Sequence, residues 1–150
     1  NIPCTEQTRH LFAYVPQDYA LFSGTVLENM QMVRPDISMD MLRSALSAAQ
    51  ADFIWDMPQK EKTHVQENNA GLSKGQLQRL AIARAIAQAP PIILADEPTG
   101  NLDTASRDQI HSLLMSVREQ FNQTIVMVTH DMGLADSVDR KIVMSDGCIL

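Results

Sequence analysis

The chain has 150 residues, of which 45% are hydrophobic and 20% charged, as expected for one soluble globular domain with a sizeable core. Its formal net charge of −6 and the lack of a dense basic stripe argue against a nucleic-acid partner. No apolar run approaches the roughly 20 residues of a membrane span, and the first residues show no signal-peptide pattern. The two cysteines, Cys4 and Cys148, match no metal spacing and favour a reduced, cytoplasmic-type setting.

The first half of the chain is predicted to contain one strand and then helices. The apolar run LFAYV (11–15) is typical of a short strand. Apolar residues recur with a helical period over 38–50, and 51–57 has the pattern of another short helix. Residues 58–70 are polar and irregular, as in a connecting loop. Because 25–75 has no strand pattern, we expect a helical subdomain inserted between the first strand and the rest of the sheet.

The second half alternates strands and helices. Long helices are predicted over 74–88 and 104–120, and strands over 92–95, 124–129 and 141–145. The apolar runs in these strands are typical of strands buried on both faces, as in a parallel sheet. The alternation of strand, helix, strand, short helix and strand therefore predicts a parallel α/β sheet.

Two acidic residues, Asp96 and Glu97, directly follow the predicted strand 92–95. One interpretation is a turn residue with a solvated neighbour. The other is a phosphate–Mg²⁺ site, in which the first acid holds the metal and the second orients the attacking water. His130 ends the next strand, and parallel strands would bring it to the same edge, where ligands of such sheets bind. This edge is the candidate catalytic site.

The segment GLSKGQ (71–76) opens the predicted helix 74–88. Ser73 and Gln76 have the spacing of a capping box. Gly75 in the first turn costs helix stability, so its use would be the close approach of a ligand to backbone N–H groups. A serine hydroxyl, free N–H groups and the positive end of the helix dipole also make an anion site. Both interpretations, a helix cap and an anion site, remain open at this point.

Five motifs, taken in order, resemble the nucleotide-binding domain of ATP-binding-cassette (ABC) proteins. YVPQ resembles the Q-loop, LSKGQ the signature motif LSGGQ, IILADE the Walker B strand with its glutamate, GNLD the D-loop and VTHD the switch-histidine loop. The resemblance covers nearly the whole chain. It implies a single partial domain (1–150) with a P-loop NTPase (RecA-like) parallel sheet. The helical subdomain (about 25–75) is then inserted in an α/β core formed by 1–24 and 76–150.

The same resemblance implies an ATPase whose ligands are ATP and Mg²⁺. Asp96 would hold Mg²⁺ with help from Gln17, Glu97 would act as general base or water positioner, and His130 would stabilise the γ-phosphate. Residues of the signature motif and the D-loop would complete the nucleotide site of the opposite subunit in a head-to-tail dimer: Ser73, Lys74, Gly75, Gln76 and Asp103. Lys74 departs from the family pattern, because it replaces the first signature glycine.

The implied setting is a membrane transporter of the exporter type, with this domain on the cytoplasmic face of the membrane. LFSGTVLEN after the Q-loop resembles exporters, whereas ADEPTGNLD is more like the lipoprotein-release and macrolide-export branch. Leu21, Phe22 and Glu67 are the residues expected to contact the transmembrane domain. The alternatives are a non-transport ATPase of the superfamily, acting in translation or DNA repair, and a catalytically silent module that supplies signature and D-loop to a partner.

One motif of the family is absent from this sequence. The phosphate loop GxxxxGK[ST] lies upstream of the Q-loop in the family, and here no lysine follows a glycine. We therefore expect the chain to be a fragment that begins after that loop. The 150 residues by themselves are expected to be inactive as an ATPase.

Overall fold

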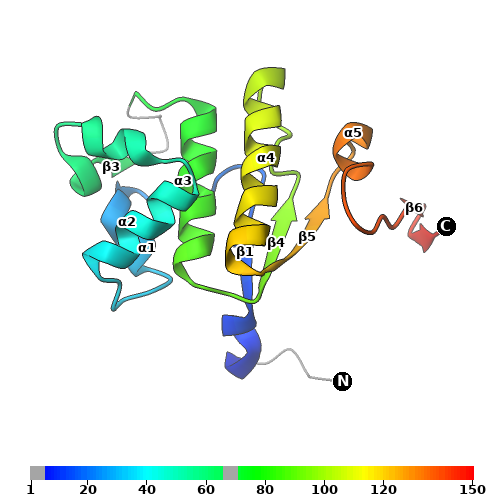
Figure 1. Ribbon diagram of the computed structural model, residues 1–150, viewed down its shortest axis with the longest axis horizontal. Coiled ribbons are helices and arrows are strands. Elements are labelled where there is room, and N and C mark those ends of the chain that lie inside the picture. The colour runs from blue at the N-terminus through cyan, green and yellow to red at the C-terminus, as the bar shows by residue number, and fades with distance from the viewer. Residues whose placement is uncertain (1–5, 66–70) are drawn as a thin grey trace.

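The computed structural model of the protein describes residues 6–65 and 71–150. Cys4 and Glu67 lie outside the described residues. At the centre of the fold is a three-stranded parallel sheet with the order β1-β4-β5 (Figure 1). Its strands are β1 (Phe12–Val15), β4 (Ile92–Asp96) and β5 (Thr124–Val128). The predicted α/β fold with a parallel sheet is confirmed.

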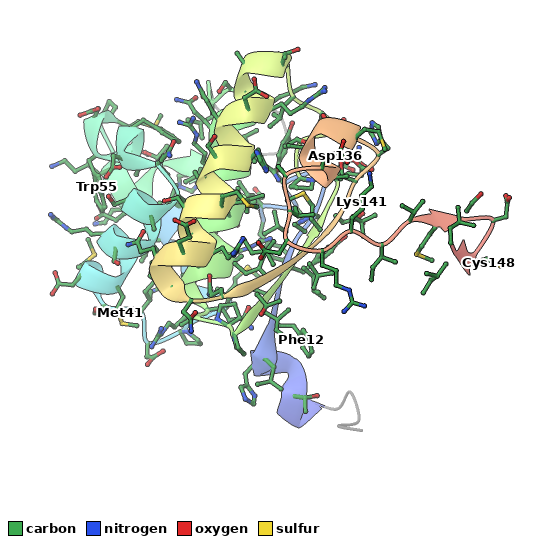
Figure 2. All side chains as sticks on the ribbon, turned by 45° about the vertical axis from the view of Figure 1, so that its right-hand side comes forward. Phe12, Met41, Trp55, Asp136, Lys141 and Cys148 are labelled. Carbon is green, nitrogen blue, oxygen red and sulfur yellow. The ribbon has the colours of Figure 1, made fainter. Side chains whose placement is uncertain are left out.

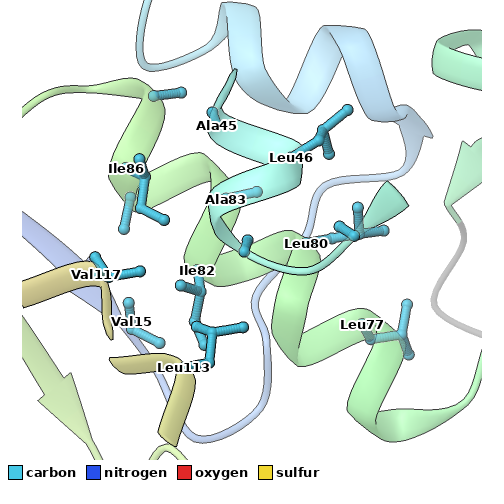
Figure 3. Packing of buried hydrophobic residues seen from close by; sticks show 14 of the residues in the cluster. Val15, Ala45, Leu46, Leu77, Leu80, Ile82, Ala83, Ile86, Leu113 and Val117 are labelled. Carbon is cyan, nitrogen blue, oxygen red and sulfur yellow. The ribbon is translucent and has the colours of Figure 1, made fainter. Parts of the chain in front are cut away.

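One face of the sheet is covered by α3 (Lys74–Ala87) and α4 (Thr104–Phe121), which lie side by side in Figure 1. Alternate strand residues point to this face, and they are at most 3% exposed: Ala13, Val15, Ile93 and Ala95. Figure 3 shows Val15 among Ile82, Leu113 and Val117 of the two helices. The parallel strands are thus held in register by burial of their alternate side chains against α3 and α4.

The opposite face of the sheet is open. Tyr14, Val126 and Val128 are 54%, 50% and 60% exposed, and Phe12 is also exposed. The prediction of a buried strand is therefore wrong for β5, and in β4 the residues on this face, Ile92 and Leu94, are only partly buried. Apolar residues on both faces of a strand indicate where side chains could be buried, but among the described residues only one face is covered by helices.

A helical layer packs against the side of α3 away from α4. It consists of α1 (Val26–Gln31), α2 (Met39–Ala48) and two 3-10 helices, η2 (Asp52–Asp56) and η3 (Lys60–Lys62). Figure 3 shows Ala45 and Leu46 of α2 beside Leu80 and Ala83 of α3. These residues are at most 3% exposed, so the layer shares one continuous core with the sheet.

This layer also contains strand pairing, which the sequence did not predict. β2 (Gly24–Thr25) pairs antiparallel with β3 (His64–Val65). The prediction of no strand between 25 and 75, and of an irregular loop over 58–70, is wrong at these positions. Two-residue strands have too few alternating side chains to leave a pattern, and the pairing depends on a contact between distant segments.

The C-terminal residues form a small extension beyond β5. After α5 (Met132–Ala135), β6 (Met144–Ser145) and β7 (Cys148–Ile149) form an exposed antiparallel pair. The predicted strand 141–145 is therefore not a buried strand of the parallel sheet. Figure 2 shows Cys148 on this projecting hairpin, while Asp136 and Lys141 form an ion pair near its base.

The helices begin where the sequence supplies side-chain caps. Ser38 caps α2, Ser73 caps α3 and Asp103 caps α4, each accepting a hydrogen bond from the backbone three residues ahead. α4 ends at Asn122, which has the left-handed conformation with φ of 50°. The observed helices and the 3-10 helix η1 (Glu6–Leu11) are all too short or too polar to cross a membrane, within the residues described.

Candidate active site

Asp96 and Glu97 lie at the carboxyl end of the central strand β4. The backbone N–H of Glu97 donates to the carbonyl of Val128 at 2.9 Å, which extends the contact with β5 by one residue. Glu97 itself is left-handed, with φ of 44°. This conformation costs a non-glycine residue about 1 kcal/mol or more, and such outliers gather at functional sites. The chain thus turns sharply at Glu97 and directs its side chain toward the end of β5.

Glu97 and His130 are in direct contact. Oε1 of Glu97 accepts the backbone N–H of His130 at 2.8 Å and lies 2.8 Å from Nδ1 of the same residue. The hydroxyl of Thr129 lies 3.5 Å from the other oxygen, Oε2. An ionised carboxylate only accepts, so the tautomer with its proton on Nδ1 is the one that makes this contact a hydrogen bond. The predicted juxtaposition of the histidine with the acids is therefore observed, and it is a hydrogen-bonded pair with Glu97.

Asp96 is bound by a residue that sequence reasoning did not single out. The hydroxyl of Tyr14, on the neighbouring strand β1, donates to Oδ2 of Asp96 at 3.0 Å. This bond to a carboxylate raises the pKa of the Tyr14 hydroxyl. Among the described residues, Oδ1 of Asp96 accepts no hydrogen bond. One carboxylate oxygen is therefore held by the protein, and the other is free for a ligand.

Gln17 follows β1 and lies against the GNLD turn. A Cβ atom added to Gly100 would come within 2.7 Å of the Gln17 Nε2 atom, so the glycine leaves room for this amide. Asn101 donates to the Asp18 carboxylate at 2.8 Å and to the Gln17 carbonyl at 3.4 Å. The Q-loop and the GNLD turn, whose contacting residues Asp18 and Asn101 are 83 positions apart, thus form one contact next to Glu97.

The signature segment forms its capping box at the start of α3. Ser73 Oγ accepts the backbone N–H of Gln76 at 3.2 Å, and the Gln76 side chain accepts the N–H of Ser73 at 2.8 Å. The structural interpretation of this pair is therefore correct. It leaves the Ser73 hydroxyl hydrogen free to donate, so an anion site is still compatible with the cap. The side chain of Lys74 is exposed beside it.

The start of α3 lies next to the start of α4. A Cβ atom on Gly75 would lie 3.5 Å from the Ser106 hydroxyl, an ordinary contact, so packing within this chain does not require glycine. Asp103 accepts the backbone N–H and the hydroxyl of Ser106 at 2.9 and 2.8 Å, and these bonds lower the pKa of its carboxyl group. The signature segment and the D-loop residue Asp103 are thus neighbours.

The predicted site residues consequently fall into two groups. Gln17, Asp96, Glu97 and His130 gather at the carboxyl edge of the sheet, whereas Ser73 to Gln76 gather with Asp103 at the starts of α3 and α4. Among the described residues, no hydrogen bond or ion pair joins the signature residues to the acids or His130.

The loop that carries His130 is tied to α4. Asp131 caps α5 by accepting from the backbone of Gly133 and Leu134, and it forms an ion pair with Arg107 of α4 at 3.2 Å. Backbone donation from Leu134, and then from Gly133 with the Arg107 contact, lowers the pKa of Asp131. The ion pair with Arg107 therefore restrains Asp131, the residue directly after His130.

Of the two described residues expected at a membrane-domain interface, Phe22 is the more available. It is 52% exposed, whereas Leu21 is half-buried against the core. The buried Asn29 accepts from the backbone N–H of Phe22 at 2.8 Å and donates to its carbonyl at 2.9 Å. The Arg84 guanidinium lies 5.4 Å from the Phe22 ring centroid. The backbone of Phe22 is thus held by Asn29, and its ring lines a groove of about 590 Å³ that also includes Tyr14 and Arg84.

The donor set at the carboxyl edge fits Mg²⁺. Asp96 has one free carboxylate oxygen, and Gln17 offers an amide oxygen, both hard ligands of the type that Mg²⁺ prefers. No group of three or more His, Cys, Asp or Glu side chains that could hold a metal by itself occurs among the described residues. A Mg²⁺ ion that is also bound by phosphates requires only one or two protein oxygens, so this sparse set is sufficient.

Several contacts at or near the candidate sites were missed from the sequence: those of Tyr14, Asn29, Asn101 and the Arg107–Asp131 pair. Tyr14 had one usable signal, a polar hydroxyl within an otherwise apolar strand three residues before Gln17. The others are polar residues in helices or turns, where such residues are common on the surface.

The sequence of this chain matches a known protein family. The family model described as ABC transporter matches residues 2–100. The lipoprotein-releasing system ATP-binding protein LolD of Cytophaga hutchinsonii is 51% identical over 79 residues, which cover 53% of this chain and 36% of that protein. The pediocin PA-1 transport/processing ATP-binding protein PedD of Pediococcus acidilactici is 37% identical over 144 residues, covering 95% of this chain and 20% of that protein.

The fold matches solved structures as well. A bacterial Atm1-family ABC exporter, solved with ATP bound, superposes with a TM-score of 0.79 at 35% identity, over 93% of this chain and 24% of that one. This chain belongs to the ABC transporter family. It spans at most 36% of the length of these three proteins. ABC transporter domains are ATPases as a family.

Proposed function

We propose that this chain binds ATP with Mg²⁺ and takes part in ATP hydrolysis that drives export of a substrate across a membrane. The proposal depends chiefly on one observation, the hydrogen-bonded Glu97–His130 pair beside Asp96 at the carboxyl edge of the sheet. Two relatives support the transport role: the pediocin PA-1 transport/processing ATP-binding protein and the Atm1-family ABC exporter.

The residues at the edge have distinct roles in this proposal. Glu97 orients the attacking water and accepts its proton, because its carboxylate is only partly exposed and is fixed by His130 and Thr129. His130 holds Glu97 through Nδ1, which leaves Nε2 to face the γ-phosphate. Asp96 and Gln17 hold Mg²⁺. When bound, Mg²⁺ neutralises charge on the phosphate oxygens.

A second nucleotide-binding domain completes each site in a head-to-tail dimer. Among the described residues, no hydrogen bond or ion pair joins the signature residues to Asp96 or Glu97, which supports their use by the opposite subunit. Ser73 contributes a hydroxyl, Gly75 and Gln76 contribute backbone N–H groups, and the exposed Lys74 adds a positive charge beside them. Asp103, next to this segment, lies in the same interface.

The other partner in the proposal is a transmembrane domain, which would place the chain at the cytoplasmic face of the membrane. Phe22 is the main candidate for this contact. Leu21 and Glu67 are the other two residues predicted to make it. Phe22 offers an exposed aromatic ring next to a groove, and aromatic residues are enriched at protein interfaces.

The proposal is tested by Glu97→Gln in the full-length protein. Steady-state ATPase turnover should fall by about 100-fold or more, the range for loss of a general base, while affinity for ATP stays within about threefold. Ser112→Ala, an exposed change on α4, is a matched control that should leave both values unchanged. Turnover of Glu97→Gln within about tenfold of the parent would remove Glu97 from the catalytic role.

We also infer that the 150 residues by themselves do not hydrolyse ATP. Phosphoryl transfer depends on a cradle of backbone N–H groups and a lysine around the phosphates, and no GxxxxGK[ST] run occurs in this sequence. The purified 150 residues should show no turnover above that of their Glu97→Gln variant. Turnover that the substitution removes would contradict this inference.

A further inference from the structure

The side chains of Tyr14 and Asp96 meet across two neighbouring strands. Parallel pairing places Tyr14 opposite Leu94, so Asp96 lies two residues further along β4 on the same face of the sheet. The tyrosine side chain spans this offset, and its hydroxyl reaches Oδ2 of Asp96 at 3.0 Å. The contact therefore follows from the register of β1 and β4, two strands of the sheet.

We propose that Tyr14 is a positioning residue for Mg²⁺ binding, because its hydroxyl fixes the Asp96 carboxylate so that Oδ1 faces the metal. The proposal rests on the proposed role of Asp96 as a Mg²⁺ ligand. It assigns no bond between Tyr14 and the metal or nucleotide. Tyr14 acts through Asp96 only.

The chemistry of the contact supports this direction of effect. A neutral hydroxyl that donates to Oδ2 leaves the full negative charge on the carboxylate and restricts its rotation. Outer partners of metal-binding carboxylates act in this way, and their loss typically weakens metal binding by about 10- to 100-fold. The Tyr14–Asp96 bond is partly open to water, so we expect the lower end of that range.

The ring of Tyr14 has apolar neighbours apart from the hydroxyl contact. It lines the groove of about 590 Å³ together with Phe12 and Leu94, which lie on the same face of the sheet. Phenylalanine at this position keeps the ring and its apolar contacts and removes the donor alone. Tyr14→Phe is therefore a clean test of the hydrogen bond.

The experiment measures ATP affinity of the full-length protein in Mg²⁺ and in EDTA, in a Glu97→Gln background in which ATP is consumed slowly. The affinity in Mg²⁺ divided by the affinity in EDTA reports the contribution of the metal. Tyr14→Phe should lower this ratio by about 3- to 10-fold and leave the affinity in EDTA unchanged. Tyr19→Phe is the matched control: its hydroxyl makes no hydrogen bond among the described residues, and the ratio should not change.

The outcomes separate this inference from the function on which it rests. Asp96→Asn should abolish most of the Mg²⁺ effect, and an unchanged ratio in that variant would overturn the role of Asp96 itself. If Asp96→Asn lowers the ratio and Tyr14→Phe leaves it within twofold, Asp96 keeps its role and the Tyr14 inference is overturned. An equal loss of affinity in Mg²⁺ and in EDTA on Tyr14→Phe would also overturn the Tyr14 inference, because it would indicate a general structural role. The same fall in the ratio on Tyr19→Phe would overturn it for the same reason.

Discussion

His130 reaches Glu97 twice, through its backbone N–H and through its ring, and both contacts end on the same oxygen, Oε1, at 2.8 Å. The left-handed backbone at Glu97 makes this possible, because it turns the side chain toward the end of β5. The His130 side chain is 80% exposed, whereas the Glu97 side chain is 19% exposed. The pair therefore has an inner member that is fixed and an outer member that is open to a ligand.

A first prediction follows from this pairing. His130→Ala should lower ATPase turnover by about 10²- to 10³-fold, the usual loss for a donor to transition-state charge. Since Glu97 and His130 act as one unit, the double variant with Glu97→Gln should be hardly slower than Glu97→Gln. Steady-state rates of the three variants and the parent complete the cycle. Losses that multiply would show that the two residues act separately.

A second prediction separates the two roles of Ser73. Ser73→Ala removes the cap of α3 and should cost about 1 kcal/mol of stability. Ser73→Asp keeps a good cap but places a negative charge where the phosphate is expected, so stability should be retained while ATPase turnover falls by about tenfold or more. Thermal unfolding and turnover are measured for both. Full activity in Ser73→Asp would show that Ser73 acts as a helix cap and does not bind the phosphate.

A third prediction concerns the contact between Gly100 and Gln17. In Gly100→Ala the new methyl group would overlap the Gln17 amide, which is the flexible end of a side chain and can move. Stability should change by less than about 0.5 kcal/mol, whereas the Mg²⁺ concentration for half-maximal turnover should rise. Gln17→Ala combined with Gly100→Ala should be no worse than Gln17→Ala. An additive loss in the double variant would mean that Gly100 acts elsewhere.

A fourth prediction is a pH dependence at Asp131. Its pKa in the folded protein lies below the ordinary value of 3.8, so its ionised form stabilises the fold above that pH. This stabilisation is lost as pH falls through the folded-state pKa. Asp131→Asn keeps the cap of α5 but has no charge for Arg107, so it should unfold at a lower temperature than the parent at neutral pH.

The thermal midpoints of the two proteins are compared across pH. The difference should be constant from about pH 7 to pH 5 and shrink below about pH 4, where the parent also loses its charge. A gap that persists unchanged into acid would show that the aspartate charge is not its cause.

The long helices and the central strands could be predicted from the sequence because each carries its own periodic pattern. The helix predicted over 74–88 is observed as Lys74–Ala87, and that over 104–120 as Thr104–Phe121. The two-residue strands β2, β3, β6 and β7 escaped or were misplaced, because pairing that short depends on which distant segment lies alongside. The open face of the sheet was misjudged for a related reason: apolar residues do not specify what covers them.

The sequence by itself determined the order of the motifs, and with it the residue types available at the site: the acids after β4, the histidine after β5 and the capped start of α3. These features can be predicted from local patterns and from the capping residue, because each involves residues that are close together in the chain. Only the tertiary structure decided that Glu97 holds His130, that Tyr14 holds Asp96 and that Gly100 leaves room for Gln17. These contacts join residues 33, 82 and 83 positions apart, and strand register together with the turn at Glu97 brings them within reach.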